Sequence, residues 1–131
     1  APISMETLFK EMTDSVADLA IIRRRIADSS WAPTLRTMSS THFGKMIKLV
    51  DLDFDQPNVA VVVAEQIPYF TCQYVVAAVR AASDWNRSTM VEKLVPLCTD
   101  LVANQQIILS ELSDWDKIVT EGVFEKALGQ L

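Results

Sequence analysis

The spacing of apolar residues near the start of the chain favours a helical fold. Between Met5 and Ala27, eight apolar side chains recur at intervals of three and four residues, which places them on one face of an α-helix. Acidic residues lie early in this segment and Arg23, Arg24 and Arg25 lie near its end, an order that complements the helix dipole. The segment predicts one amphipathic helix of about six turns.

Prolines and polar stretches divide the rest of the chain into further helices. Segment 51–58 combines acidic residues with a proline and predicts a loop. Pro68 and Pro96 each fall inside an apolar run and predict a kink or a break. The last helix is expected to begin at Ser113 and to stop near Gly129.

The glycine content supports the same fold class. Only three glycines occur in 131 residues, which argues against a fold built from many β-hairpins. The β-branched run at 59–63 could form a buried strand, but it continues without a turn signal, and its length favours helix. We therefore expect a single all-α domain over residues 1–131 with five to eight helical segments.

A tripeptide occurs twice and suggests an internal period. Ser83-Asp84-Trp85 and Ser113-Asp114-Trp115 lie 30 residues apart. Asp28-Ser29-Ser30-Trp31 is a looser third copy. A period of about 30 residues is typical of α-solenoids, whereas Ser-Asp is also common N-cap chemistry and Trp a common core anchor. Two architectures stay open: a multi-helix bundle and a short α-solenoid-like array of helix pairs.

Two short stretches carry a family resemblance. Thr71-Cys72-Gln73-Tyr74-Val75-Val76 and Thr41-His42-Phe43-Gly44-Lys45-Met46-Ile47 resemble the second-helix pattern of Pumilio-type RNA-binding repeats. The resemblance implies stacked helical repeats, but the spacing between the stretches is short for that family. No base-reading role is carried over to these residues.

The distribution of charge argues against a nucleic-acid partner. The net charge is −5, with seven basic and five acidic residues up to position 50, and five basic and twelve acidic residues after it. A protein that binds phosphates usually carries a basic surface. We expect no nucleic acid among the partners.

The side-chain inventory offers no assembled catalytic or metal chemistry. His42 is the only histidine, and the two cysteines lack C-x-x-C spacing. The acidic run that starts at Asp51 resembles a calcium loop, but Gln56 and Val62 stand where that loop needs Gly and Glu. We expect no enzyme activity, no cofactor and no metal.

The lengths of the apolar runs and the two cysteines indicate the cellular compartment that we expect. The longest uncharged run, 66–79, is too short for the roughly 20 residues that span a bilayer. Cys72 and Cys98 lie in apolar segments and are expected to be buried and reduced. A cytoplasmic or nuclear protein without a membrane span is expected.

The remaining features favour a non-catalytic protein–protein interaction module that presents a helical face or groove to a protein partner, with homo-oligomerisation left open. The partner-binding candidates are Trp31, Trp85, Trp115, Arg23, Arg24 and Arg25. The alternative is a carrier of a small apolar, lipid-like ligand in a cavity of a helical bundle. Its ligand-binding candidates are Tyr69, Gln73 and Tyr74.

Overall fold

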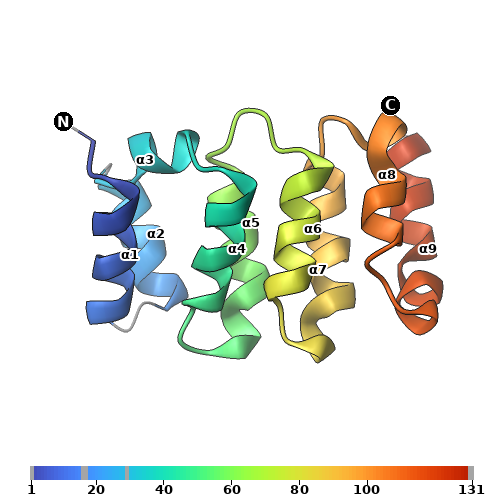
Figure 1. Cartoon of the computed structure of the whole chain (residues 1–131), viewed down its shortest axis with the longest axis horizontal. Helices are drawn as coiled ribbons and strands as arrows, with labels where there is room; N and C mark the ends of the chain where they lie inside the picture. Colours follow the sequence, from blue (N-terminus) through green and yellow to red (C-terminus); the bar gives the residue numbers. More distant parts are fainter. Residues whose placement is uncertain (1, 16–17, 29, 130–131) are drawn as a thin grey trace.

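The computed structural model describes residues 2–15, 18–28 and 30–129, and its regular elements in these ranges are all helical (Figure 1). The α-helices are α1 (Met5–Asp14), α2 (Leu19–Ala27), α3 (Ala32–Arg36), α4 (Ser40–Lys48), α5 (Gln56–Ala64), α6 (Cys72–Ala81), α7 (Arg87–Leu94), α8 (Leu101–Leu109) and α9 (Asp114–Gly129). Three 3-10 helices, η1 (Asp53–Asp55), η2 (Asp84–Asn86) and η3 (Val95–Leu97), complete them. The all-α prediction is confirmed, although the described residues hold more helices than the five to eight expected.

The helices form a row of pairs in two layers. Figure 1 shows α1, α4, α6 and α8 side by side in one layer, with α2, α5, α7 and α9 in the layer behind. The two ends of the chain lie at opposite ends of the row. Packing contacts follow this order, because α6 contacts α4 and α8 in its own layer and α7 in the other. Of the two architectures left open by the sequence, this row of pairs corresponds to the short α-solenoid-like array.

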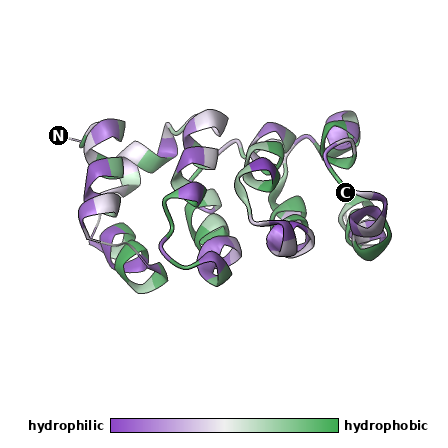
Figure 2. Cartoon of the chain, turned by 60° about the horizontal axis from the view of Figure 1, so that its bottom comes forward, coloured by the Kyte–Doolittle hydropathy of each residue, from purple (hydrophilic) through white to green (hydrophobic). Residues whose placement is uncertain are grey.

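The core runs along the row between the layers. Figure 2 shows this most clearly at α6 and α7, where hydrophobic residues face the other layer and hydrophilic residues face outward. The buried side chains at the centre include Val59, Val63, Val75, Val79, Met90 and Leu94. At the closest approach of α4 and α6, a Cβ atom on Gly44 would lie 3.2 Å from the carbonyl oxygen of Ala77. A glycine therefore suits this crossing.

The prediction of one long helix from Met5 to Ala27 is wrong, because the segment contains two helices, α1 and α2. The hydroxyl of Ser15 donates to the carbonyl oxygen of Glu11 at 2.5 Å and closes α1. The carboxylate of Asp18 accepts from the backbone N–H of Ile21 at 2.9 Å and begins α2. An acidic N-cap satisfies free backbone donors and so favours a new start over a continued helix.

The predicted breaks at the prolines and the predicted start of the last helix agree with the structure, whereas the predicted loop 51–58 does not. Pro68 lies in the loop between α5 and α6, and Pro96 lies in η3 directly after α7. Ser113 caps α9, since its hydroxyl oxygen accepts from the backbone N–H of Asp116 at 3.1 Å. The predicted loop 51–58 is too long, because Gln56 already begins α5 and Pro57 occupies its first turn, where a missing N–H costs little.

A buried polar network ties two turns together. The side-chain amide of Asn86 donates to the carbonyl oxygen of Asp53 at 2.6 Å and to Oε1 of Gln56 at 3.0 Å. The same Oε1 accepts from the backbone N–H of Ser83 at 3.2 Å, and the Ser83 hydroxyl bonds Oδ2 of Asp53 at 2.8 Å. Gln56 and Asn86 are buried, so these bonds fix the α4–α5 turn against the α6–α7 turn.

Asp100 joins two helix starts in a similar way. Its Oδ1 accepts from the backbone N–H of Cys72 at 2.8 Å, and its Oδ2 accepts from the side-chain amide of Asn104 at 2.8 Å. Partial burial alone would raise the pKa of this carboxyl, but the hydrogen bonds from Cys72 and Asn104 bring it below its usual range. The charged form of Asp100 is therefore favoured in the folded protein.

Replacing Asn86 by Ala should lower the free energy of unfolding by about 1–3 kcal/mol, because Gln56 and Asp53 would lose their buried donor. Asn58→Ala is the matched control, since Asn58 is exposed on α5, and it should change stability by less than about 0.5 kcal/mol. Urea unfolding followed by circular dichroism measures both. Equal stability of the two variants would contradict a structural role for the network.

Replacing Asp100 by Ala should lower the free energy of unfolding by about 1 kcal/mol at pH 7. Because the folded-state pKa of Asp100 lies below the unfolded value, its stabilising effect is present above that unfolded value and is lost as the pH falls through the folded pKa. The difference from wild type should therefore shrink below about pH 4. Urea unfolding between pH 7 and 3 tests this, with exposed Asp51→Ala as control; a gap that stays constant with pH would count against it.

Candidate functional site

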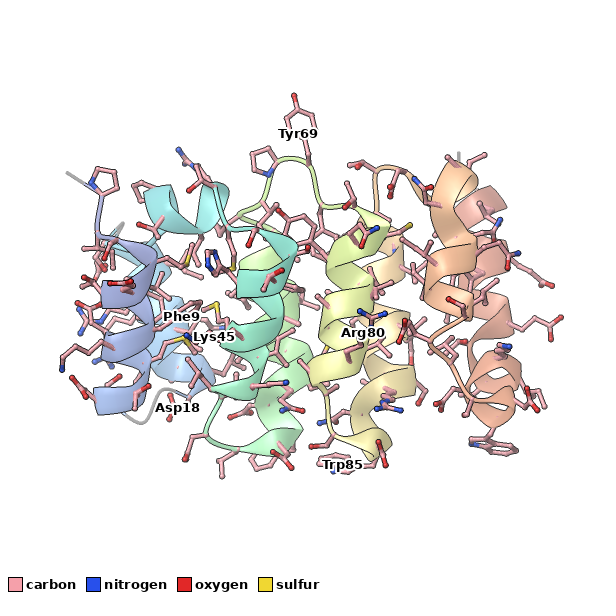
Figure 3. All side chains as sticks on the ribbon, viewed as in Figure 1. Phe9, Asp18, Lys45, Tyr69, Arg80 and Trp85 are labelled. Atoms are coloured by element: carbon pink, nitrogen blue, oxygen red, sulfur yellow. The ribbon has the colours of Figure 1, made fainter. Side chains whose placement is uncertain are left out.

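Three exposed aromatic side chains lie on successive turns of the array. The turns α4–α5, α6–α7 and α8–α9 all lie along the lower edge in Figure 1, and Figure 3 shows Trp85 projecting from this edge. Phe54, Trp85 and Trp115 are 61%, 63% and 71% exposed. We call these three residues the aromatic edge.

The local sequence places these rings where they can project outward. Each ring is the second residue of a new helix and follows an aspartate that begins η1, η2 or α9. Side chains in a helix point back toward its N-terminus, so a residue in the first turn extends beyond the end of the helix. This position permits exposure without dictating it, because Cys72 and Leu101 also open helices and are buried.

The aromatic edge is surrounded by carboxylates. The stretches 49–55, 82–86 and 110–116, the last of which includes the start of α9, are directly flanked by Lys48, Arg87 and Lys117, and their acidic residues are Asp51, Asp53, Asp55, Asp84, Glu111, Asp114 and Asp116. Two of these carboxylates are paired from neighbouring helices: Arg87 Nη2 lies 3.3 Å from Asp84, and Arg80 Nη2 lies 2.6 Å from Glu111. The bond to Arg80 lowers the pKa of Glu111. The stretches that carry the rings are therefore predominantly acidic, with one basic residue directly beside each of them.

The turns that carry the rings are held in place. The peptide carbonyl before Phe54 and the residue after Trp85 belong to the network of Gln56 and Asn86. The Arg80–Glu111 pair connects α6 to the α8–α9 turn. The turns of Phe54 and Trp85 are therefore tied to each other by buried hydrogen bonds, whereas the turn of Trp115 is connected to α6 by a partly exposed ion pair.

Trp31 does not belong to this surface. It is fully buried, and its indole N–H donates to Oε2 of Glu11 at 2.6 Å. It directly precedes α3, so the looser copy 28–31 is not equivalent to the two Ser-Asp-Trp turns. Core anchoring, one of the two roles considered for the tryptophans, holds for Trp31 and is wrong for Trp85 and Trp115.

The arginine run also lies elsewhere. Arg23 and Arg24 are exposed and Arg25 is half-buried, all in the second half of α2. Asp18, the N-cap of helix α2, lies toward the edge that carries Trp85 in Figure 3, and the helix runs toward the opposite edge. The structure thus does not bring the arginines together with Trp85 and Trp115.

The three residues expected to line a ligand cavity point in different directions. Tyr69 is 80% exposed and projects from the opposite edge of the array (Figure 3), and Gln73 is exposed on α6. Tyr74 is half-buried, donates its hydroxyl to the carbonyl oxygen of Met38 and packs against Phe43 and Phe70. The trio does not share a cavity.

Sequence reasoning missed Phe54, although a signal was present. Asp53-Phe54-Asp55 lies one further period before Asp84-Trp85-Asn86 and shares its acid–aromatic order. The aspartates of segment 51–58 also match a loop and the start of a calcium pattern. A search for an acidic residue followed by any aromatic residue, rather than by Trp alone, identifies the α4–α5 turn with Phe54.

A second apolar surface closes one end of the row. Val102 on α8 and Ile118 on α9 are exposed, and a groove between these helices is lined by Leu109, Phe124 and Leu128 together with polar residues. The groove has a volume of about 470 Å³.

The part of the chain that the structure describes holds no cluster of three or more His, Cys, Asp or Glu side chains suited to a metal ion. Within the same residues, no helix has both the length and the apolar character that crossing a membrane requires. Cys72 is buried and Cys98 half-buried, and burial raises the pKa of both thiols, that of Cys98 to about 12. A thiol with so high a pKa is a poor nucleophile at neutral pH.

The exposures predict how the tryptophans fluoresce. In a Trp85→Phe, Trp115→Phe variant only buried Trp31 emits, so its emission should shift to shorter wavelength and resist quenching by acrylamide. In wild type, caesium should quench more strongly than iodide, because carboxylates surround Trp85 and Trp115. Steady-state quenching measures both effects. Strong acrylamide quenching of Trp31 would contradict its burial.

Comparison with known proteins adds no relative from which a role could be transferred. No family model, no curated protein and no solved structure matches this chain.

Proposed function

We propose that this protein is a non-catalytic interaction module that binds a protein partner through the aromatic edge. The observation that carries the proposal is the exposure of Phe54, Trp85 and Trp115 on three successive turns of one edge. Tryptophan is enriched among the residues that dominate binding energy at interfaces, and its large rigid ring loses little conformational entropy.

The architecture supports this role. Stacked helix pairs form extended surfaces on which equivalent positions recur, and we interpret α4–α5, α6–α7 and α8–α9 as helical repeats. Each repeat then contributes one ring and at least one carboxylate to a shared surface. A partner that contacts all three turns gains affinity from several modest contacts.

Three further expectations concern a carrier function, the cellular compartment and self-association. The carrier alternative gains no support, because Tyr69, Gln73 and Tyr74 diverge. We keep the cytoplasm or nucleus as the proposed compartment, since two free thiols suit a reducing environment. Homo-oligomerisation stays a proposal, and a measurement of molecular mass in solution can test it directly.

A selection from a random peptide library tests the proposal while the partner is still unidentified. Wild type should enrich a shared peptide motif, and a Phe54→Ala, Trp85→Ala, Trp115→Ala variant should lose that enrichment, because the rings supply the contact area. Sequencing of the selected pools and measured affinities of single peptides give the result.

Tyr69→Ala is the matched control, since it removes a comparably exposed ring from the opposite edge and should retain the motif. Circular dichroism shows whether each variant is folded. No motif from wild type, or the same motif from the triple variant, would contradict the proposal. Native mass spectrometry of both proteins completes the test, because a dimer lost in the triple variant would make the partner a second copy.

A further inference from the structure

We propose that Cys72 and Cys98 are a site of oxidative modification, at which reaction with a small disulfide such as oxidised glutathione forms a reversible bond between the two sulfur atoms. These are the two cysteines of the chain, and they lie 26 residues apart in the sequence. The inference concerns a different part of the molecule from the aromatic edge and does not depend on the proposed binding function.

The fold brings together the two segments that carry the cysteines. The backbone N–H of Thr99, the residue after Cys98, donates to the carbonyl oxygen of Phe70 at 2.9 Å, and the Thr99 hydroxyl donates to the same oxygen at 3.2 Å. The backbone N–H of Cys72 donates to Oδ1 of Asp100 at 2.8 Å. Three hydrogen bonds therefore hold the start of α6 beside the segment that leads into α8.

The two thiols also influence each other. Burial is the main cause that raises the pKa of Cys72, and Asp100 and Cys98 raise it further. Burial likewise raises the pKa of Cys98 to about 12, whereas a hydrogen bond with the Cys72 side chain lowers it. Together with the backbone bonds, this mutual effect places the two side chains next to each other, which is the arrangement that a disulfide requires.

The two thiols differ in their access to solvent, and this difference sets the order of the reaction. Cys98 is half-buried, whereas Cys72 is buried at the start of α6. Cys98 first loses its proton to solvent and attacks one sulfur of the small disulfide, which forms a mixed disulfide and releases one small thiol. Cys72 then loses its proton and attacks the Cys98 sulfur, which releases the second small thiol.

The reaction is balanced in electrons and protons. The protein loses two protons and two electrons and gains one S–S bond, while the small disulfide takes up both and becomes two thiols. The raised thiol pKa values make the reaction slow at neutral pH, because the thiolate is the attacking form. The product is favoured nonetheless, because the second step joins two groups that the fold already holds together.

The surroundings of the pair fit a disulfide better than a structural metal site. Among the residues in the described ranges, no group of three or more His, Cys, Asp or Glu side chains is suited to a metal ion. A structural zinc site needs four ligands, whereas a disulfide needs only the two thiols.

The disulfide would close a loop that contains α6, η2, α7 and η3. Such a bond restricts the unfolded chain more than the folded chain, in which the two segments already lie side by side. Trp85 follows the other end of α6, on the edge opposite Tyr69 (Figure 3), so the bond forms away from the aromatic edge. We therefore expect oxidation to stabilise the fold and to leave the aromatic edge exposed.

The test is equilibration of the purified protein with mixtures of reduced and oxidised glutathione at mildly alkaline pH, in native buffer and in concentrated urea. Alkylation of the remaining thiols and mass spectrometry give the fraction of each form. Half of the protein should hold the internal disulfide at a ratio of oxidised glutathione to squared reduced glutathione that is about 10- to 300-fold lower in native buffer than in urea, because the fold favours the bond.

Urea unfolding provides a second measurement. Oxidised wild type should unfold at a higher urea concentration than reduced wild type. Cys72→Ser and Cys98→Ser are the matched controls, since each keeps one thiol and neither should gain stability in the oxidising buffer. Each variant is compared with itself under both conditions, so a loss of stability from the substitution does not affect the result.

Mass spectrometry of proteolytic fragments should show a bond between Cys72 and Cys98 within one chain. Equal glutathione ratios in native buffer and urea, or linked dimers and mixed disulfides in place of the internal bond, would overturn the inference. An oxidised protein that unfolds at a lower urea concentration than the reduced protein would do the same. The peptide selection tests the aromatic edge separately, so either proposal can fail while the other stands.

Discussion

The buried hydrogen bonds of Gln56 and Asn86 are the constraint on which the central part of the structure depends. Two buried side-chain amides must be satisfied, and here they bond each other and the nearby backbone across the α4–α5 and α6–α7 turns. Apolar packing between the layers supplies attraction, but it is not directional. The amides add the direction that keeps successive helix pairs in register.

The exposed rings lie on turns between these helices. Trp85 and Trp115 lie in the first turn of η2 and α9 and are exposed, whereas Cys72 and Leu101, which open α6 and α8, are buried. Leaving two indoles in water lowers solubility and adds no folding energy. The proposed binding role would give a physical reason for such a placement.

Much of the fold could be predicted from the sequence, because helical periodicity, the proline breaks and the Ser113 cap are local signals. The prediction of one helix over Met5–Ala27 is wrong, because apolar residues at the same helical spacing can continue through two helices that are joined by a turn. The candidate site was predictable only in part: the Ser-Asp-Trp copies marked Trp85 and Trp115, but burial of Trp31 depends on Glu11, a partner far away in the sequence.

The linear order of the helix pairs has a consequence for how the molecule opens. Each pair packs on the pair beside it, so loss of α9 at one end or α1 at the other leaves the contacts of the middle pairs in place. Fraying can proceed inward from either end rather than as a single event. Helix α6, which contacts α4, α7 and α8, is then the element whose amide hydrogens exchange with solvent last.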